Sequence, residues 1–469
     1  MIADLKRYPE RKKSGSPWLS DVPSHWEVRS LRTLIRPRNE RNRPDLPLLS
    51  VAREKGVFVR SLADEGENHN VIPEDLRNYK VARVGDLVIN KMKAWQGSMG
   101  IAPIDGIVSP AYFVYDLAIS NRAYGHALLR SKPYVAHFGQ ASDGVRVGQW
   151  DLTITGMRAI PVLVPPPAEQ AAIVRFLDWA NERLERAIRA KRKVISLLNE
   201  QKQAIIHRAV TRGLDSNVPL KPSGVPWLGD IPQHWELWRI NRFARIGNGS
   251  TPSRANPLYW HGGDYPWLNS SQVNRGYIDS ADQFVTWRAL RECHLPKVPV
   301  GSVLVAITGQ GRTRGMSAVL GIEATISQHI AFITLRMPVA SSTFIHLVLV
   351  AAYLQLRASS DDSGSTKGAI TCEELKRFKL PIPPRAEQEE LWKRIQVQTL
   401  ELDGASSRLE REINLLREYR TRLVADVVTG KLDVREAATR LPNESQIANS
   451  DDDIDVSDDP HVDEMEAFA

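Results

Sequence analysis

The chain has 469 residues but only two cysteines and no long apolar run. Cys293 and Cys372 are not spaced as a CxxC pair and have no cluster of histidines near them, so we expect neither a disulfide framework nor a zinc site. No stretch of about eighteen apolar residues is present, which argues against a membrane-spanning helix. The N-terminal sequence MIADLKRYPERKK carries charges where a signal peptide needs an apolar core, so we expect a cytoplasmic protein.

Catalytic motifs are also scarce. No HExxH or GxSxG pattern stands out in the sequence. Residues 256–259 read Asn-Pro-Leu-Tyr, close to the Asn-Pro-Pro-Tyr motif with which amino-methyltransferases hold a flipped base, but the second proline is missing and no glycine-rich cofactor loop precedes them. The glycine-rich segment at residues 309–315 fits neither the Walker A nor the GxGxxG pattern. We therefore expect no catalytic site and no bound cofactor in this chain.

Acidic residues are unevenly distributed along the chain. The net charge is +7, yet residues 441–469 contain ten Asp or Glu and no Lys or Arg, so the rest of the chain carries +17. A strongly basic folded body predicts a polyanionic partner, most simply nucleic acid. The acidic segment is predicted to be disordered, either as a solubilising appendage or as a weak internal competitor for the DNA surface.

Three motifs occur twice in the sequence, in the same order. SPWLSDVPSHWE at residues 16–27 returns as VPWLGDIPQHWE at 225–236, VGDLVI at 84–89 returns as VGSVLV at 300–305, and VPPPAEQ at 164–170 returns as IPPRAEQ at 382–388. The period is far too long for a solenoid repeat. The sequence therefore predicts a duplicated pair of domains.

Each half follows one plan. Short β-type runs broken by Gly and Pro lead to a Pro-Pro step, after which a long segment without proline begins at Ala168 and again at Ala386. Proline before the first turn, an acid in that turn, and Gly213 or Gly430 beyond the end are typical of helix boundaries. We therefore predict two long helices.

Both predicted helices carry heptad repeats. The second has Ile395, Leu402, Leu409, Leu416 and Leu423, and the first has Leu177, Leu184, Leu198 and Ile205, with Lys191 interrupting the seam. Such a narrow apolar seam needs a partner helix, and two-fold packing of the halves would make the two helices antiparallel. The alternative is that each helix covers only its own domain, although a length of roughly 65 Å at about 1.5 Å per residue exceeds the diameter of a small domain.

These motifs resemble those of a known family. The PWLGDIPQHWE stretch at 226–236, the Gly-Ser-Thr-Pro-Ser stretch at 249–253, residues 256–268, the Gly-Ser-Thr-Lys stretch at 364–367 and the Pro-Pro-x-Ala-Glu-Gln helix entries are similar to those of type I restriction-modification specificity subunits. The resemblance covers residues 15–435. The first half departs more, because it lacks the Gly-Ser-Thr-Pro stretch and has Asp-Gly-Val-Arg at 143–146 where the second half has Gly-Ser-Thr-Lys.

The resemblance implies an α+β fold with two mixed α/β target-recognition domains, separated by two long antiparallel coiled-coil helices and related by a pseudo-two-fold duplication. The expected boundaries are residues 1–167 and 214–384 for the recognition domains, 168–213 and 385–433 for the helices, and 434–469 for an acidic disordered tail.

The resemblance also implies partners. Each recognition domain would read one half of a bipartite target in double-stranded DNA, and the helices would set the spacer between the halves and dock two methyltransferase subunits. Helicase-nuclease restriction subunits would join this complex. S-adenosylmethionine, ATP and Mg²⁺ would belong to the partner subunits and not to this chain.

Candidate DNA contacts follow from residue chemistry. Arg and Gln suit base edges, while Lys, Ser and Thr suit phosphates. The candidates are Lys91, Lys93, Gln96, Arg146 and Gln149 in the first half, and Ser270, Ser271, Gln272, Gln310, Arg312, Arg314, Gln328, His329 and Lys367 in the second. Residues 309–315 are interpreted as a mobile basic loop facing DNA. Trp95 either stacks on DNA or belongs to a core, and the repeated Trp18, Trp26, Trp227 and Trp235 are interpreted as packing anchors.

Other interpretations remain open for parts of the chain. The basic stretch at residues 183–193 either lies over the DNA spacer or is a solvated face paired with Glu182 and Glu185. A self-sufficient restriction-methyltransferase is disfavoured by the missing methyltransferase motifs. A purely structural coiled-coil protein is disfavoured by the basic body and by the unlike loops of the two halves.

Overall fold

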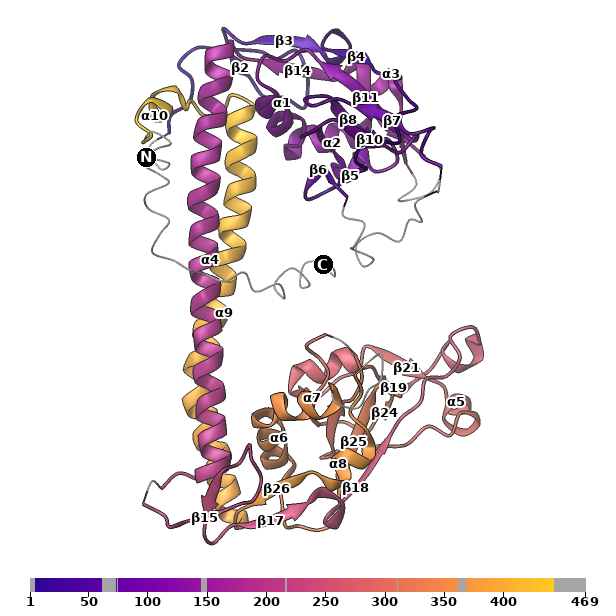
Figure 1. Ribbon diagram of the computed structural model, residues 1–469, viewed down its shortest axis with the longest axis vertical. Coiled ribbons are helices and arrows are strands. Elements are labelled where there is room, and N and C mark those ends of the chain that lie inside the picture. Colours follow the sequence, from indigo (N-terminus) through magenta and orange to yellow (C-terminus); the bar gives the residue numbers. More distant parts are fainter. Residues whose placement is uncertain are drawn as a thin grey trace. The chain divides into compact units, whose positions relative to one another are not determined.

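The computed structural model describes residues 5–60, 73, 75–144, 150–215, 217–309, 311–361 and 368–442. The chain forms two compact units, the first made of residues 1–190 and 412–469 and the second of residues 191–411. Two long helices, α4 (Pro167–Arg212) and α9 (Arg385–Val428), contribute to both units, so the division between units falls inside each helix (Figure 1). The predicted mixture of helices and sheets with two long helices is confirmed.

The first unit is built around a four-stranded antiparallel sheet in the order β4-β11-β8-β9. Two-stranded pairs and short helices lie around this sheet (Figure 1). Its strands are β1 (Arg11–Lys12), β2 (Val22–Pro23), β3 (Glu27–Ser30), β4 (Ile35–Pro37), β5 (Leu49–Ala52), β6 (Gly56–Val59), β7 (Lys80–Ala82), β8 (Leu87–Asn90), β9 (Met99–Ile101), β10 (Gly106–Val108), β11 (Tyr112–Leu117), β12 (Ser142–Asp143), β13 (Asp151–Leu152) and β14 (Pro161–Val164). Its short helices are α1 (Arg122–Leu129), α2 (Lys132–Gln140), α3 (Ile154–Ala159) and α10 (Arg435–Thr439), with 3₁₀ turns η2 (Leu31–Thr33) and η3 (Ala94–Gln96).

The second unit has a five-stranded sheet in the order β18-β25-β22-β23-β20 and a three-stranded sheet in the order β21-β19-β24. Its strands are β15 (Leu220–Pro222), β16 (Asp230–Pro232), β17 (Glu236–Arg239), β18 (Ala244–Asn248), β19 (Tyr265–Leu268), β20 (Tyr277–Ile278), β21 (Gln283–Val285), β22 (Val303–Ala306), β23 (Ser317–Leu320), β24 (Thr325–Ile326), β25 (Ile330–Leu335) and β26 (Lys379–Ile382). Its helices are α5 (Trp287–Glu292), α6 (Ser342–Ala351), α7 (Tyr353–Asp361) and α8 (Cys372–Arg377), with 3₁₀ turns η4 (Ile240–Arg242), η5 (Pro257–Tyr259) and η6 (Ser270–Arg275).

A buried tryptophan anchors the first turn of α4 in the first unit. Trp26 is completely buried, and its Nε1 donates to Glu169 Oε1 at 3.0 Å. His25 Nε2 lies 2.7 Å from Glu169 Oε2, and the Tyr8 hydroxyl donates to Glu169 Oε1 at 2.5 Å. Burial, followed by this hydrogen bond, raises the pKa of Tyr8, which keeps the phenol in its donating form. The repeated His-Trp pair thus binds the acid of the Ala-Glu-Gln motif.

The second unit contains the same contact at the start of α9. Trp235 is completely buried and its Nε1 donates to Glu387 Oε1 at 3.1 Å, while His234 Nε2 lies 2.8 Å from Glu387 Oε2. The glycine that follows the other long helix closes each anchor. A Cβ on Gly213, which has a φ of +74°, would lie 3.3 Å from the ring of Trp235, and only a glycine fits this left-handed helix end without strain.

The repeated Pro-Trp of each half also packs against a core. Trp18 stacks on His137 at 4.3 Å between ring centroids, and Trp227 stacks on Phe378 at 5.9 Å. Both rings are partly buried against the main hydrophobic cluster of their own unit. These positions agree with the interpretation of the repeated tryptophans as packing anchors.

The long helices pair with opposite directions within each unit. In the first unit, Phe176 near the start of α4 shares a core with Val427 near the end of α9, and Glu185 forms an ion pair with Arg420. In the second unit, Val210 near the end of α4 shares a core with Leu391 near the start of α9, and Lys202 Nζ lies 2.6 Å from Asp403 Oδ1. The heptad seams therefore face a partner helix, as expected.

One expectation about the C-terminal segment is wrong. We expected disorder from residue 434 onward, yet Val434, Ala438 and Leu441 are buried in the core of the first unit and residues 435–439 form α10. The prediction relied on the acidic charge of the segment, but its apolar residues before Pro442 are sufficient to pack against the core of the first unit. Arg175 of α4 also donates to the carbonyl of Leu441 at 3.0 Å. Residues 443–469 lie outside the described residues.

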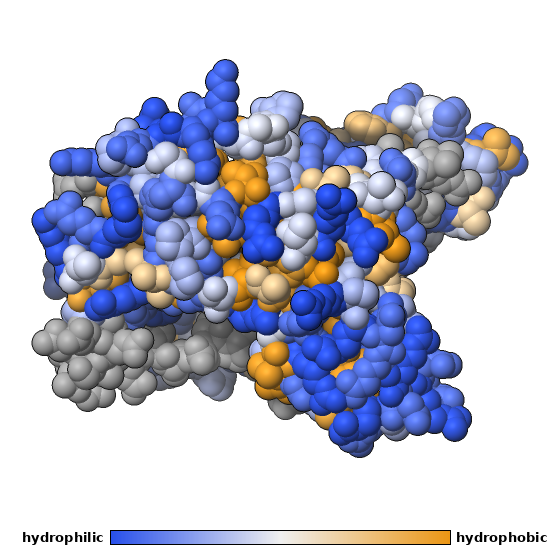
Figure 2. Space-filling model, turned by 90° about the horizontal axis from the view of Figure 1, so that it is seen from above, coloured by the Kyte–Doolittle hydropathy of each residue, from blue (hydrophilic) through white to orange (hydrophobic). Residues whose placement is uncertain are grey.

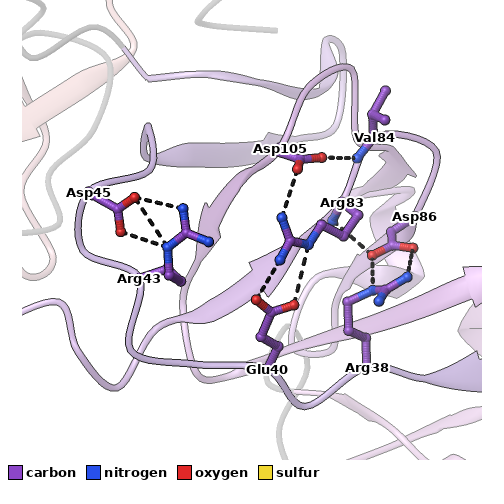
Figure 3. Close-up of polar contacts among 8 residues, drawn as sticks. All are labelled: Arg38, Glu40, Arg43, Asp45, Arg83, Val84, Asp86 and Asp105. Atoms are coloured by element: carbon purple, nitrogen blue, oxygen red, sulfur yellow. Dashed lines mark hydrogen bonds and ion pairs between the residues drawn. The ribbon is translucent and has the colours of Figure 1, made fainter.

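A network of ion pairs stabilises the first unit beside its four-stranded sheet (Figure 3). Asp86, which is 2% exposed, accepts from Arg38 Nε at 2.5 Å and from the amide of Arg83 at 2.8 Å. The Arg83 guanidinium contacts Glu40 at 2.5 Å and Asp105 at 2.9 Å. The hydrogen bond to Asp86 raises the pKa of Arg38. This network joins the segment after β4 to the turns before β8 and β10.

Asp86→Asn should destabilise the first unit by about 2–3 kcal/mol, because a buried carboxylate that accepts charged hydrogen bonds becomes a neutral amide of the same size. Arg43→Ala provides the matched control, since Arg43 and Asp45 form a solvent-screened pair in the same view (Figure 3) and should contribute much less to stability. Urea denaturation followed by circular dichroism measures both values. Equal effects of the two substitutions would show that the buried network contributes no more than a surface pair.

Candidate nucleic-acid interface

Several loops of the second unit meet at one end of its five-stranded sheet. The strand pairs Asn248↔Ala331, Ala306↔Ile330 and Val305↔Ser317 are antiparallel, whereas Tyr277↔Val319 is parallel. The carboxyl ends of β18 and β22 therefore lie beside the amino ends of β25, β23 and β20. Residues 249–254, 270–276, 307–309, 311–316 and 327–329 follow or precede these strand ends, and we call them the loop end of the second unit.

Polar side chains form a connected strip at this loop end. Thr251 Oγ1 donates to Gln328 Oε1, Gln328 Nε2 lies 3.2 Å from His329 Nε2, and His329 Nδ1 lies 2.6 Å from Thr308 Oγ1. Gln328 and His329 are exposed. Ser271 is also exposed and Ser270 is half-buried, at the start of η6. Arg312 is exposed as well. Five of the nine candidate residues of the second half, Arg312 included, thus have side chains available at this end.

Two candidates at the same end are buried. Gln272 is 2% exposed, and its Oε1 accepts from the amide of Asn269 in the capping box that begins η6. Arg314 is 4% exposed. Neither side chain reaches the surface in this conformation, because helix capping and close packing occupy them. Gln310 and Lys367 lie outside the described residues.

The backbone of the glycine-rich loop is held by neighbouring residues, although we expected a mobile loop. The Tyr353 hydroxyl donates to the Arg312 carbonyl at 2.7 Å, and Arg357 Nη1 donates to the Gly311 carbonyl at 2.7 Å. Asn274 Nδ2 also donates to Thr313 Oγ1 at 3.2 Å. The loop therefore presents the exposed Arg312 side chain from a braced backbone.

A neutral histidine supports the start of β23 beneath this loop. His346 Nδ1 lies 2.9 Å from the hydroxyl of Ser317, the first residue of β23. Burial, with a smaller effect of the charge of Lys202, lowers the pKa of His346 to about 4. The imidazole therefore carries no charge near neutral pH and acts as packing rather than as a cationic contact.

The first unit places its candidates after the corresponding strand, β8. Lys91 Nζ pairs with Asp151 Oδ2 at 2.9 Å, whereas Lys93 is exposed and forms no ion pair within the part of the chain that the structure describes. Gln96 is half-buried. Half-buried Trp95 donates to the Met92 carbonyl at 3.2 Å, and its ring lies 5.1 Å from that of Trp150.

The remaining candidates of the first half, Arg146 and Gln149, lie outside the described residues. Their flanks are nevertheless fixed beside Lys91, since the amide of Leu152 donates to the Lys91 carbonyl at 2.9 Å. In the second unit, the amide of Ile370 donates to the Ile307 carbonyl at 2.8 Å. In each unit, a backbone hydrogen bond thus joins the end of one strand, β8 or β22, to the segment that follows the undescribed residues.

Contacts of the basic stretch of α4 lie mainly with the helices themselves. Arg183 stacks on Trp179 at 5.3 Å, Arg186 pairs with Glu182 at 3.1 Å, and Glu185 pairs with Arg420. These contacts favour the alternative of a paired helix face over a surface that covers DNA.

The described residues contain no candidate metal site and no candidate membrane span. No group of three His, Cys, Asp or Glu in those ranges is arranged to hold a metal ion. No helix there combines the length and the apolar character that a membrane crossing needs. The face drawn in Figure 2 is mainly hydrophilic, with apolar residues scattered across it.

Known proteins share these features. The family described as "Type I restriction modification DNA specificity domain" matches residues 232–411. A protein of Methanocaldococcus jannaschii described as "Putative type I restriction enzyme MjaX specificity subunit" is 20% identical over 472 residues, which cover 93% of this chain and 100% of that protein. The EcoR124I/EcoR124II specificity subunit of Escherichia coli is 23% identical over 258 residues, which cover 53% of this chain and 57% of that protein.

Residues 232–411 of this chain match the type I specificity domain, and the chain along most of its length is similar to type I restriction-modification specificity subunits. The resemblance stated from the sequence is therefore confirmed. A chain from the structure described as "Structural basis underlying complex assembly and conformational transition of the type I R-M system" has the same fold, with a TM-score of 0.61 at 16% identity over 88% of this chain and 99% of that one.

Sequence reasoning missed three residues of this specificity subunit's loop end. Thr251 lies in the Gly-Ser-Thr-Pro stretch that marked the family, and Thr308 follows β22 directly, so both had a signal that we did not use. Arg254 is exposed and stacks on Trp260 at 3.7 Å. The sequence alone does not indicate this contact, because it depends on how the chain turns back toward β19.

Proposed function

We propose that this specificity subunit reads a bipartite sequence in double-stranded DNA, one half with each unit. The observation that supports this most is the strip formed by Thr251, Gln328, His329 and Thr308 at the loop end of the second unit. Amide, imidazole and hydroxyl groups held by one another are suited to base edges and phosphates. Residues 1–167 and 214–384 are the proposed recognition domains, with the candidate residues given above as proposed contacts, apart from buried Gln272 and Arg314.

The recurrence of one plan in both units supports a duplicated, two-fold related reader. Trp26 binds Glu169 as Trp235 binds Glu387, and β8 leads to its loops as β22 does. The loop ends themselves differ, because the first offers Lys91 and Lys93 where the second offers Thr308 and a glycine-rich loop. Equal scaffolds with unlike loops are expected of two modules that read different sequences.

We further propose that the helix pair sets the spacer between the two half-sites and docks two methyltransferase subunits. Exposed apolar side chains on the helices support a docking role, since α4 exposes Val194 and Leu197 and α9 exposes Val397, Leu400 and Leu415. Helicase-nuclease subunits would complete the restriction complex. S-adenosylmethionine, ATP and Mg²⁺ would be bound by those partners.

The double variant Gln328→Ala, His329→Ala tests this proposal. Loss of a base-edge contact should weaken binding to the cognate duplex by about 1–3 kcal/mol, or roughly 5- to 150-fold, with little change on a scrambled duplex. The cognate sequence comes from methylation mapping of the subunit expressed with its methyltransferase partner, and fluorescence anisotropy measures the affinities.

Arg336→Ala is the matched control, because exposed Arg336 follows β25 at the opposite end of the same sheet. It should leave cognate binding within about twofold of wild type. Cognate affinity that falls for Arg336→Ala but not for the double variant would place the DNA at the other end of the sheet and refute the proposed interface.

A further inference from the structure

Arg254 is an exposed cation of the second unit whose guanidinium is held by several neighbouring side chains. Its guanidinium carbon lies 3.7 Å from the centroid of the Trp260 ring and 5.0 Å from that of Trp267, and its Nη2 donates to Gln283 Oε1 at 2.7 Å. The two rings meet edge to face at 5.2 Å. Stacking on two rings and a hydrogen bond to a strand residue together fix both the plane and the direction of the guanidinium.

The two tryptophan rings that hold Arg254, which we call the clamp, form hydrogen bonds with the loop that carries Arg254. Trp260 Nε1 donates to the Ser253 carbonyl at 3.1 Å, and Trp267 Nε1 donates to the Ser250 carbonyl at 3.2 Å. Trp267 is 3% exposed and belongs to β19. The loop from residue 250 to 254 is therefore wrapped around a rigid aromatic support, and little conformational entropy remains to be lost when Arg254 binds a ligand.

No described side chain neutralises the charge of Arg254. No carboxylate in the described ranges forms an ion pair with it, and Gln283, its hydrogen-bond partner, is neutral. Neighbouring arginines differ, since Arg275 pairs with Asp282 at 2.9 Å and Arg288 pairs with Glu292 at 2.8 Å. A guanidinium has five N–H donors, so donors of Arg254 remain for an external acceptor.

Arg254 adjoins the polar strip of the loop end. The Ser250 amide donates to the Ile326 carbonyl at 3.0 Å, which places the start of the 250–254 loop beside the residues that lead to Gln328. Thr251, three residues before Arg254, bonds directly to Gln328. A fixed cation thus extends the strip of hydroxyl, amide and imidazole groups formed by Thr251, Gln328, His329 and Thr308.

We propose that the clamped guanidinium of Arg254 is a DNA contact of the second unit and donates to an oxygen or nitrogen acceptor of the duplex. This inference rests on the proposed function, which places DNA at the loop end. A preorganised planar fork matches both a guanine edge, with O6 and N7, and a phosphate. In either case Arg254 adds a guanidinium beside the strip of Thr251, Gln328 and His329.

Arg254→Met tests the proposal, because methionine keeps an apolar stem over the tryptophan rings but removes the charge and the donors. We expect about 10- to 100-fold weaker binding to the duplex identified by methylation mapping, with an unchanged melting temperature. Arg288→Met is the control, since Arg288 is exposed in the same unit and already paired. Its affinity should stay within about twofold of wild type.

The two acceptors give different results. If Arg254 contacts a guanine edge, the loss of binding affinity is confined to the cognate duplex, and Arg254→Lys weakens binding as much as Arg254→Met does. The methylation map then also shows relaxed specificity at one base position. For a phosphate, cognate and scrambled duplexes lose equally, Arg254→Lys retains most of the affinity, and the slope of log affinity against log salt falls by about 0.9.

Arg254→Met binding within about twofold of wild type on both duplexes would overturn the proposal and leave Arg254 as a cover for the aromatic rings. The Gln328→Ala, His329→Ala variant, measured alongside, distinguishes a failure of the Arg254 contact from a failure of the whole proposed interface. If that variant loses affinity while Arg254→Met does not, only the role of Arg254 fails. If neither loses affinity, the proposed DNA interface at the loop end fails as well.

Discussion

Trp26→Ala should destabilise the first unit by about 3–5 kcal/mol, the usual range for truncating a fully buried tryptophan. The ring is 0% exposed, and its loss leaves a cavity beneath the first turn of α4. The Glu169 carboxylate also loses a donor at 3.0 Å while remaining 6% exposed, so part of the cost is a buried charge with one partner fewer. Trp235→Ala should do the same to the second unit, through Glu387.

Hydrogen exchange measured by mass spectrometry resolves this effect by unit. Peptides of the first unit should exchange faster in Trp26→Ala and those of the second unit in Trp235→Ala. Trp287→Ala is the control, because Trp287 is 52% exposed and the same truncation should cost less than about 1 kcal/mol. Trp26→Phe retains most of the volume but not the hydrogen bond, and it should fall between the two. An effect of Trp26→Ala no larger than that of Trp287→Ala would contradict the anchor.

The long helices were predictable from the sequence because their signals are local. A Pro-Pro step, an acid in the first turn, heptad spacing and a terminal glycine all lie within or beside one element, and α4 and α9 begin at Pro167 and Arg385 as these signals indicate. The reason for the repeated Glu and Gln was not predictable. Glu169 binds Trp26, 143 residues away, and Gln170 accepts from the amide of Asn121 at 2.9 Å.

The loop end was predictable only in outline. Polar and basic residues after strand-like runs indicated one end of the sheet, and the structure brings Gln328, His329 and Arg312 together there with exposed side chains. Residue type did not separate them from Gln272, which the capping box of η6 buries. Arg254 was missed for the opposite reason, since its orientation comes from Trp260 and Trp267, and stacking between loop and strand has no periodicity in the sequence.

Lengthening both helices by one heptad should lengthen the DNA spacer, if the helix pair sets the distance between the half-sites as proposed. A copy of residues 192–198 inserted after Leu198 and a copy of residues 407–413 inserted after Ser406 keep the seam in register. Leu198 lies four residues before Lys202 and Ser407 four residues after Asp403, and this antiparallel pair fixes the alignment. Each helix grows by about 10 Å at about 1.5 Å per residue.

Insertions of two residues at the same sites are the matched control. They add a similar bulk of helix but rotate Leu416 and the other seam residues away from the partner helix, so the subunit should fold or assemble poorly. The heptad variant should assemble normally, because each seam position is replaced by an equivalent one. Its half-site sequences should be unchanged, since neither loop end is altered.

Methylation-site mapping of the complex that carries the heptad insertions tests the account most directly. At roughly 3.4 Å of duplex per base pair, about 10 Å of added helix should lengthen the spacer by about three base pairs, with both half-site sequences retained and some loss of affinity because the recognition domains also rotate around the duplex. An active complex that methylates sites with the original spacer would contradict the proposal that two units read two half-sites at a distance set by α4 and α9.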